Sequence, residues 1–265
     1  MTLERNQVYC MDALELLRQL DDASVDCIVT SPPYDNLRTY NGYSWDFEGI
    51  ARDSYRVLKD GGVMVWVVGD ATIDGSETLT SFRQALYFKD VVGFRMHDTM
   101  IYNRLGTPHH APNRYIDEAE YMFVLTKGAP QTVNLQTQKK VNFNQGGSKI
   151  TPDGGRARFV YENTTNERVR GNVWAFFTGN NHTTKDDVDH PAMFPEALAE
   201  RHILTWSNPG DLVLDFFGGS GTTAKMARAN GRDYITGDIS EEYCDLMRRR
   251  LALPYTLPMF EAVRP

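Results

Sequence analysis

Residues 212–224 read LVLDFFGGSGTTA, an apolar run that passes through a glycine turn into a segment of helical pattern. The apolar run predicts a buried strand, and the segment after the glycines predicts a helix. Gly219, Gly221 and Ala224 fit the pattern G-x-G-x-x-G/A, which is informative only between a strand and a helix, as it stands here. The stretch therefore predicts one strand–turn–helix unit of an α/β fold, with a ligand site at the turn.

The glycine turn has the chemistry of a nucleoside site. Glycines let the backbone turn sharply and let a ligand approach closely, and the helix that begins at Thr222 presents unpaired N–H groups there. Asp238 ends the next predicted strand, where an acid accepts hydrogen bonds from both ribose hydroxyls. A dinucleotide and S-adenosylmethionine both fit this pattern, so the turn alone leaves a nicotinamide-dependent oxidoreductase open.

A second turn, Thr30-Ser31-Pro32-Pro33-Tyr34, follows another apolar run. Its two prolines lack N–H groups, so the turn offers bare carbonyls beside the Ser31 hydroxyl, all of them acceptors. Two acceptors that hold an exocyclic amino group favour a pyramidal nitrogen, whose lone pair then points at a methyl donor. Tyr34 offers a face on which a flipped base stacks. The structural alternative is a proline turn with a packed tyrosine.

Strand and helix patterns alternate along the chain, which predicts a mostly parallel sheet. Strands are expected at 7–10, 25–29, 63–68, 94–102, 120–125, 212–216 and 234–238. Helices are expected at 13–20, 47–58, 81–88, 195–205, 222–230 and 241–251, and glycines at 61 and 62 are expected to end the second of them. The stretch 127–189 is rich in Gly, Asn, Thr and Gln and is too long for a plain connection, so it predicts a functional insertion.

The formal net charge of −7 argues weakly against a nucleic-acid partner, because phosphate binding requires Lys and Arg. Residues 139–170 differ, since seven basic against three acidic side chains give them a local charge of +4. The basic residues are Lys139, Lys140, Lys149, Arg156, Arg158, Arg168 and Arg170. This segment is compatible with local DNA contact, and a solvated irregular loop is the alternative.

The composition is that of an ordinary globular protein. With 265 residues, 41% hydrophobic and 24% charged, the chain is long enough for one α/β domain with an insertion. Cys10, Cys27 and Cys244 show no paired spacing, which indicates a reducing compartment without a disulfide framework or a structural zinc. The histidines show no ligand spacing, so no metal is expected. We find neither a membrane-span length of apolar residues nor the apolar core of a signal peptide.

The two turns together resemble the S-adenosylmethionine-dependent DNA amino-methyltransferases. The Ser31–Tyr34 turn after a buried strand is similar to their catalytic motif, and residues 215–223 are similar to their cofactor motif, usually Asp-Pro-Phe-x-Gly-Ser-Gly-Thr-Thr. This chain departs from that pattern once, with Phe216 in place of the proline. Catalytic motif first, variable region next and cofactor motif last is the permuted order of the family's beta group. The resemblance covers about 1–127 and 172–251.

The resemblance implies a Rossmann-like class I methyltransferase fold, with a seven-stranded, mostly parallel sheet and helices on both faces. It implies a catalytic domain formed by 1–127 and 172–265, and a target-recognition region at 128–171. It implies that Ser31, Pro32, Pro33 and Tyr34 are catalytic. It implies cofactor contacts from Asp12, Asp215, Phe217, Gly219, Gly221, Thr222, Asp238 and Pro195. Asp12 matches an acid near both base and cofactor, and Pro195 ends a segment that resembles a cofactor-contacting one.

The function implied is site-specific transfer of a methyl group from S-adenosylmethionine to the exocyclic amino group of a flipped base in double-stranded DNA. No cysteine lies beside the Pro-Pro turn, which argues against methylation of a ring carbon. The family associates Ser at position 31 with cytosine-N4 enzymes and Asp with adenine-N6 enzymes, so cytosine-N4 is favoured and adenine-N6 is the alternative.

Two remoter functions explain less of the chain. A nicotinamide-dependent oxidoreductase leaves Ser31 to Tyr34 unexplained, and a non-catalytic DNA-binding module requires a damaged motif, whereas both motifs look intact. A homodimer and a cognate restriction endonuclease are kept open as protein partners. A cytoplasmic enzyme, bacterial, archaeal or phage-encoded, is expected.

Overall fold

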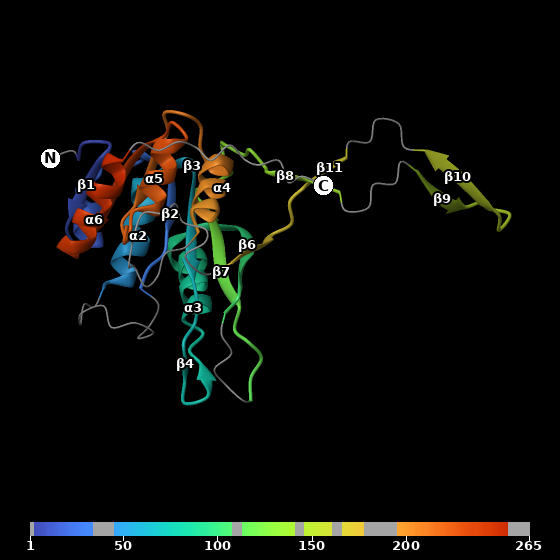
Figure 1. Ribbon diagram of the computed structural model, residues 1–265, viewed down its shortest axis with the longest axis horizontal. Coiled ribbons are helices and arrows are strands. Elements are labelled where there is room, and N and C mark those ends of the chain that lie inside the picture. Colours follow the sequence, from blue (N-terminus) through green and yellow to red (C-terminus); the bar gives the residue numbers. More distant parts are fainter. Residues whose placement is uncertain are drawn as a thin grey trace. The chain divides into compact units, whose positions relative to one another are not determined.

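The computed structural model describes residues 3–33, 45–107, 113–140, 146–160, 166–177 and 195–253. The chain divides into two compact units: unit 1 comprises Met1–Asn134 and Asn172–Pro265, and unit 2 comprises Leu135–Gly171. Figure 1 shows the elements of both units in sequence colours.

Unit 1 is built on an eight-stranded sheet. Its strands, in spatial order, are β1 (Gln7–Cys10), β14 (Asp233–Asp238), β13 (Leu212–Asp215), β2 (Val25–Thr30), β3 (Leu58–Val68), β7 (Ala119–Thr126), β6 (Arg95–Leu105) and β12 (Val173–Phe177). The first five run parallel, β7 is antiparallel to both of its neighbours, and β12 is parallel to β6. The expected mostly parallel sheet is confirmed.

The described part of the sheet has eight strands, whereas seven were expected. The additional strand is β12, which lies in the stretch 127–189 that lacks apolar periodicity but within 172–265, the part expected to belong to the catalytic domain. It has five residues, and its side chains alternate between exposed positions and positions that face the core, where Trp174 is buried. So short a run carries little periodicity, and its place at the sheet edge comes from backbone pairing with β6.

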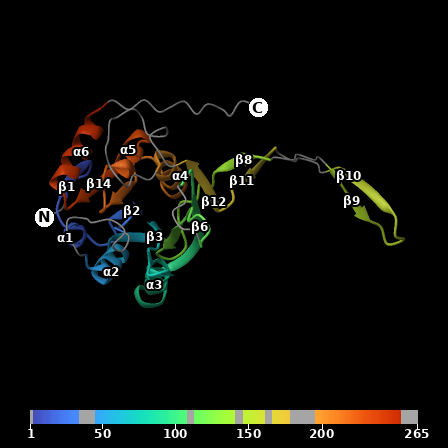
Figure 2. The same cartoon turned by 60° about the horizontal axis from the view of Figure 1, so that its bottom comes forward.

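Helices cover both faces of this sheet (Figure 2). The helices are α1 (Ala13–Arg18), α2 (Phe47–Val57), α3 (Thr80–Tyr87), α4 (Glu196–Trp206), α5 (Thr222–Ala229) and α6 (Glu241–Ala252), with a π-turn η1 (Phe88–Val92) after α3. On β3, Met64 and Trp66 pack in a core with α1, α2 and α3, whereas Val63 and Val65 pack in a second core with α4 and α5. Successive strand side chains thus serve opposite faces, as the strand period requires.

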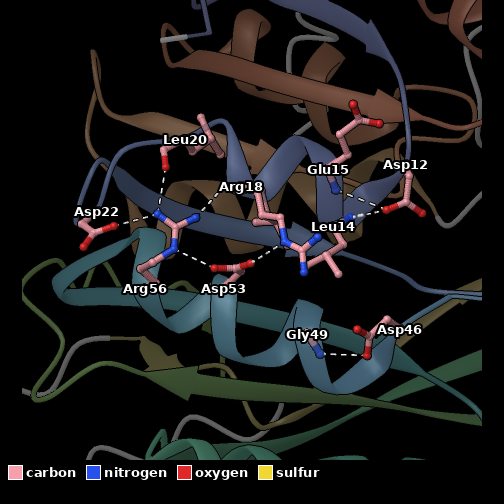
Figure 3. A network of polar contacts seen from close by, with 11 residues as sticks. Asp12, Leu14, Glu15, Arg18, Leu20, Asp22, Asp46, Gly49, Asp53 and Arg56 are labelled. Atoms are coloured by element: carbon pink, nitrogen blue, oxygen red, sulfur yellow. Dashed lines mark hydrogen bonds and ion pairs between the residues drawn. The ribbon is translucent and has the colours of Figure 1, made fainter. Parts of the chain in front are cut away.

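Helices α1 and α2 are joined by polar contacts beside the first core (Figure 3). The Arg56 guanidinium of α2 donates to the Leu17 carbonyl of α1 at 2.8 Å, and just beyond the end of α1 it donates to Asp22 at 2.7 Å and to the Leu20 carbonyl at 2.9 Å. Asp46 caps the start of α2 by accepting the Gly49 N–H at 3.0 Å. These contacts set the helix that follows β1 against the helix that precedes β3.

The glycines at 61 and 62, expected to end the helix at 47–58, lie within a strand and not at a helix end. Helix α2 ends at Val57 and β3 starts at once at Leu58, so Gly61 lies inside the strand. Its φ is +79°, and a Cβ there would meet Cγ of Gln131 at 2.3 Å. The β2–β3 register also shifts here, between Val25 and Cys27. The glycine is needed because residues 129–131 pass close to a bulged strand.

Within the described residues of unit 2, the strands form two antiparallel pairs. β8 (Thr137–Lys139) pairs with β11 (Glu167–Val169), and β9 (Gly146–Ile150) pairs with β10 (Arg156–Val160). The expected insertion began at residue 128, but residues 128–134 pack with unit 1, where the N–H of Asn134 donates to the Thr205 carbonyl at 2.9 Å. A small hairpin of unit 1, β4 (Thr72–Ile73) and β5 (Ser76–Glu77), precedes α3.

Candidate functional site

The two predicted turns lie on neighbouring strands of the sheet. β13 pairs in parallel with β2, so the carboxyl ends of both strands lie at the same edge. There the Thr30 hydroxyl donates to Oδ1 of Asp215 at 2.8 Å, and both side chains are buried. The last residue of β2 is therefore bonded to the last residue of β13, although 185 positions separate them in the sequence.

Asp215 lies at the junction between the two turns. Its Oδ1 also accepts the N–H of Phe217 at 3.1 Å, and the side chain is 2% exposed. Burial raises the pKa of Asp215 to about 6, while the hydrogen bonds from Thr30 and from the Phe217 N–H act in the opposite direction. The cofactor contact that the sequence predicted for Asp215 stays a prediction, and the geometry places this carboxylate where it also aligns one turn with the other.

The glycine turn has a fixed backbone. Gly219 and Gly221 have φ of +50° and +80°, in the left-handed region that favours glycine. The N–H of Gly221 donates to the Gly218 carbonyl at 2.7 Å, and the N–H of Gly218 donates to the Gly237 carbonyl at 2.8 Å. Thr222 then begins α5. The turn is thus pinned to the end of β14, with the start of a helix beside it.

Asp238 stands at the end of β14, next to this turn. Its two carboxylate oxygens each accept one backbone N–H, from Gly219 at 3.0 Å and from Ser240 at 2.9 Å. Burial raises the pKa of Asp238, and these hydrogen bonds act in the opposite direction. A carboxylate has about four acceptor positions, so two hydrogen bonds leave capacity for a ribose diol. These free acceptor positions fit the ribose hydroxyls of a nucleoside cofactor.

Asp12 follows β1, whose last residue Cys10 is paired with Asp238. It caps α1, since Oδ1 accepts the N–H groups of Leu14 at 2.9 Å and of Glu15 at 3.2 Å (Figure 3). The side chain is half-buried. The structure therefore places Asp12 at the same edge of the sheet as Asp238, and one of its oxygens has a capping role.

An aromatic cluster lies behind the two turns. Phe216 is buried with its ring 6.5 Å from that of Trp66, and Phe217 is half-buried with its ring 5.3 Å from that of Trp45. Phe216 stands where the family motif has proline, and its side chain fills core space on the α1–α3 side of the sheet. This packing explains how the departure is accommodated.

The proline turn itself begins directly at the end of β2. Pro32 is buried, and Ser31 and Pro33 are half-buried. Tyr34 lies outside the described residues, so its role stays a prediction. Pro195 is buried at the start of α4, where its carbonyl accepts the Leu198 N–H at 2.9 Å.

All the residues predicted to contact DNA lie in unit 2. For Arg158 the structure describes only the backbone. The exposed ones are Lys139, Lys149, Arg156 and Arg168, and the half-buried ones are Lys140 and Arg170. Among the residues that the structure describes, no cluster of His, Cys, Asp and Glu has a metal-binding arrangement. No helix in the same residues is long and apolar enough to span a bilayer.

Sequence reasoning missed a second group of residues around the glycine turn. Arg250 ends the basic run Arg248–Arg249–Arg250 in the helix expected at 241–251, yet it is buried and donates to the Ser220 carbonyl at 2.5 Å. A signal was present, because positions 247, 250 and 251 share one helical face and two of them, Met247 and Leu251, are apolar. Thr30 was part of the quoted motif but received no role.

Comparison with known proteins gives consistent matches over most of the chain. A family model for DNA methylases of the N6/N4 type matches residues 25–249. The orphan methyltransferase M.BamHII of Bacillus amyloliquefaciens is 51% identical over 240 residues, which are 88% of this chain and 90% of that protein. The DNA adenine methyltransferase YhdJ of Escherichia coli (strain K12) is 30% identical over 260 residues, which are 91% of this chain and 80% of that protein.

Solved structures agree with these matches. The PvuII DNA methyltransferase, described as cytosine-N4-specific, superposes with a TM-score of 0.68 at 21% identity, over 97% of this chain and 89% of its own. At that identity the likeness concerns the fold alone. A Thermus thermophilus protein described as a DNA modification methylase, solved with S-adenosyl-L-methionine, gives a TM-score of 0.62 at 25% identity and covers 93% of each chain.

Proposed function

This chain belongs to the N6/N4 family of DNA methylases and is an S-adenosylmethionine-dependent DNA methyltransferase, and we propose that it methylates the N4 amino group of cytosine at a specific site in double-stranded DNA. The observation that carries the choice of base is Ser31, at the first position of the Ser-Pro-Pro-Tyr turn. The family associates serine there with cytosine-N4 enzymes.

The proposed work of the proline turn is to hold the target amino group. The Ser31 hydroxyl and a carbonyl of the turn accept its two N–H groups, which favours a pyramidal nitrogen with an available lone pair. Pro32 and Pro33 contribute no competing N–H donors. S-adenosylmethionine supplies an electrophilic methyl group. As the bond from nitrogen to the methyl carbon forms, the bond from that carbon to sulfur breaks and leaves a neutral thioether. The amino group gives up one proton, which an acceptor of the turn relays to solvent.

The proposed cofactor site is the glycine turn with its flanking residues. Asp238 binds the ribose hydroxyls, and the turn from Gly219 to Thr222 lies along the cofactor. Asp12, Phe217 and Pro195 are the further contacts proposed. The bond between Thr30 and Asp215 supports this arrangement, because it holds the cofactor turn beside the amino-group acceptors.

Entry of the base into this site requires that it leave the duplex stack. We assign Tyr34 the stacking face for the extruded base, and we assign unit 2 the contact with the surrounding DNA. The two-stranded ribbon β9–β10 supports this assignment, because a ribbon of that kind fits the major groove. Four of the basic residues of unit 2 are exposed, which suits phosphate binding.

Adenine-N6 methylation is the second candidate. The 30% identical relative from E. coli is named a DNA adenine methyltransferase, and the two amino groups require nearly the same acceptors. The homodimer and the cognate restriction endonuclease stay predictions, and the 51% identical relative is named an orphan methyltransferase.

The test is to identify the product. DNA from cells that express the chain is digested to nucleosides and examined by mass spectrometry, with cells that express the Asp238→Ala variant as the control. We expect N4-methylcytosine above the control level, and sequencing then locates the site. N6-methyladenine would replace the proposal with its alternative, and a digest without either nucleoside would contradict both.

A further inference from the structure

Three helices bring charged side chains together in the interior of unit 1. Glu196 at the start of α4, Lys225 in α5 and Arg250 in the last turn of α6 are 7%, 5% and 4% exposed. Oε1 of Glu196 accepts from Nζ of Lys225 at 2.9 Å and from Nη2 of Arg250 at 3.1 Å. Buried charges are retained only with close partners, so this cluster is a specific arrangement of these three residues.

The cluster extends to the backbone of the glycine turn. Nη1 of Arg250 donates to the Ser220 carbonyl at 2.5 Å, while Nη2 of the same guanidinium is held by Glu196. Ser220 stands between Gly219 and Gly221, two residues with positive φ and with the greatest backbone freedom of any residue type. The guanidinium therefore holds the turn at its most adaptable point.

We propose that Arg250, oriented by Glu196, is a positioning residue for the cofactor: it fixes the Ser220 peptide and so preorganises the glycine turn before S-adenosylmethionine binds. This inference rests on the proposed placement of the cofactor at that turn. Arg250 acts through the backbone of the turn and does not touch the reacting atoms.

The geometry suits arginine in particular. A guanidinium is a planar fork of five donors, so one side chain bridges a carboxylate and a carbonyl at a fixed angle. A charged donor also makes a stronger hydrogen bond than a neutral one. A lysine at position 250 would bring one ammonium group, which keeps the charge but does not fix both partners in one plane.

The rest of the turn is held from other directions. Gly218 is bonded to the Gly237 carbonyl at 2.8 Å, and Gly219 is bonded to Asp238 at 3.0 Å. Asp238 is itself a proposed cofactor contact, and its carboxylate is shared once the cofactor binds. Arg250 bonds the turn from α6, so its hold does not depend on the ligand.

The experiment measures S-adenosylmethionine binding by calorimetry for the full chain and five variants, one of which is Asp238→Ala. Arg250→Met removes the bridge, Arg250→Lys keeps the charge, and Glu196→Gln removes the group that orients the guanidinium. Arg249→Met is the matched control, because Arg249 lies in the same helical turn and is exposed. Hydrogen exchange of residues 217–223, measured without cofactor, reports the order of the turn.

We expect Arg250→Met to weaken binding about tenfold or more, as the removal of a hydrogen bond to a charged group does. Arg250→Lys is expected to recover part of the lost affinity, and Arg249→Met is expected to bind with normal affinity. In Glu196→Gln, the amides of residues 217–223 are expected to exchange faster, while exchange in β3 is unchanged. In turnover, the KM for the cofactor rises more than kcat falls. A general stabilising role would instead raise exchange throughout the sheet and leave the cofactor affinity of folded protein unchanged.

The inference fails if folded Arg250→Met binds S-adenosylmethionine as tightly as the wild type. If that variant does not fold, Glu196→Gln decides, and normal binding with normal exchange at 217–223 overturns the inference. The Asp238→Ala variant distinguishes failure of the positioning role of Arg250 from failure of the proposed cofactor site. If Asp238→Ala loses binding while Arg250→Met keeps it, the cofactor site stands and the positioning role falls. Normal binding by Asp238→Ala would remove the site assignment itself.

Discussion

Unit 1 and unit 2 hold their backbones in different ways. Unit 1 has a continuous sheet with one buried core on each face. In unit 2 the described side chains are all exposed or half-buried, and its strands form two separate pairs. The difference indicates that apolar burial stabilises unit 1. In unit 2, packing places few constraints on the side chains, so residues there can be suited to binding a partner.

The two units also place their charges differently. In unit 1, Asp215, Glu196 and Arg250 are buried and bonded to partners that shape the two turns. In unit 2 the exposed basic side chains face solvent. Substitutions in unit 1 are therefore expected to change stability or cofactor binding, and substitutions in unit 2 to change DNA affinity.

The largest expected effect is the loss of stability caused by Trp66→Ala in unit 1. The Trp66 side chain is fully buried, and Nε1 donates to Oε1 of Gln84 at 2.9 Å. Its removal leaves a cavity and an unpaired amide, which is expected to lower the free energy of unfolding by about 3–5 kcal/mol. Val169→Ala in unit 2 is the comparison, since Val169 is 53% exposed, and we expect a change within about 0.5 kcal/mol. Urea titrations followed by circular dichroism measure both, and equal losses would contradict the contrast between the units.

The second effect concerns the pH dependence of stability through Asp215. The folded protein keeps this proton up to about pH 6, while a carboxyl of ordinary pKa, 3.8, releases it earlier. Because the folded state binds more protons between these values, the free energy of unfolding falls as pH rises, by about 3 kcal/mol in all. Asp215→Asn lacks this group and keeps a carbonyl acceptor for Thr30. In urea titrations from pH 4 to 8, the free energy of unfolding of the variant is expected to rise relative to that of the wild type. Parallel plots of this free energy against pH for the two proteins would refute the assignment.

The third effect is on ligand affinity without an effect on the fold. Asp238→Ala is expected to weaken S-adenosylmethionine binding by about 1.5–3 kcal/mol, roughly ten- to hundredfold, since it removes hydrogen bonds to a charged group. Asp233→Asn is the control at the opposite end of the same strand, where Asp233 pairs with Arg5 at 2.9 Å. Calorimetry compares the two, and a loss of affinity in Asp233→Asn equal to that in Asp238→Ala would point to a general effect on β14.

The smallest expected effect on stability, and the sharpest test of unit 2, is the joint replacement of Arg156 and Arg158 by Ala. We expect unchanged stability and cofactor affinity, weaker DNA binding, and a salt dependence reduced by about one unit for each phosphate that the variant no longer binds. Val169→Ala is the control, because Val169 is an exposed residue of unit 2 that carries no charge. DNA titrations at several salt concentrations decide, and unchanged affinity in the arginine variant would move the recognition surface elsewhere.

Most of the sheet follows from apolar runs in the sequence, since runs such as 63–68 have few alternatives to a buried strand. The missed strand, β12, is short and half exposed, so its pattern is weak. Gly61 was misassigned because a glycine after a helix usually ends it, and the close approach of Gln131 that requires it here involves residues far along the chain.

The candidate site shows the same limit. Gly219, Gly221 and Asp238 could be named as candidates from the sequence, because the roles predicted for them depend on local backbone and on a strand end. The bonds from Thr30 to Asp215 and from Arg250 to Ser220 depend on which strands and helices become neighbours. Hydrophobic periodicity predicts where strands occur but not their order in the sheet, so these two hydrogen bonds could be found only from the structure.

The bond between Thr30 and Asp215 has a consequence for the protein as it is made. The ribosome adds Thr30, the last residue of β2, 185 residues before it reaches Asp215. At about 5–20 residues per second, the interval is about 10–40 seconds. During that time β2 lacks its neighbour β13, and the acceptors proposed for the amino group lack the turn proposed for the cofactor. On that proposal, we expect a nascent chain to be unable to modify DNA until translation has delivered the second half of the site.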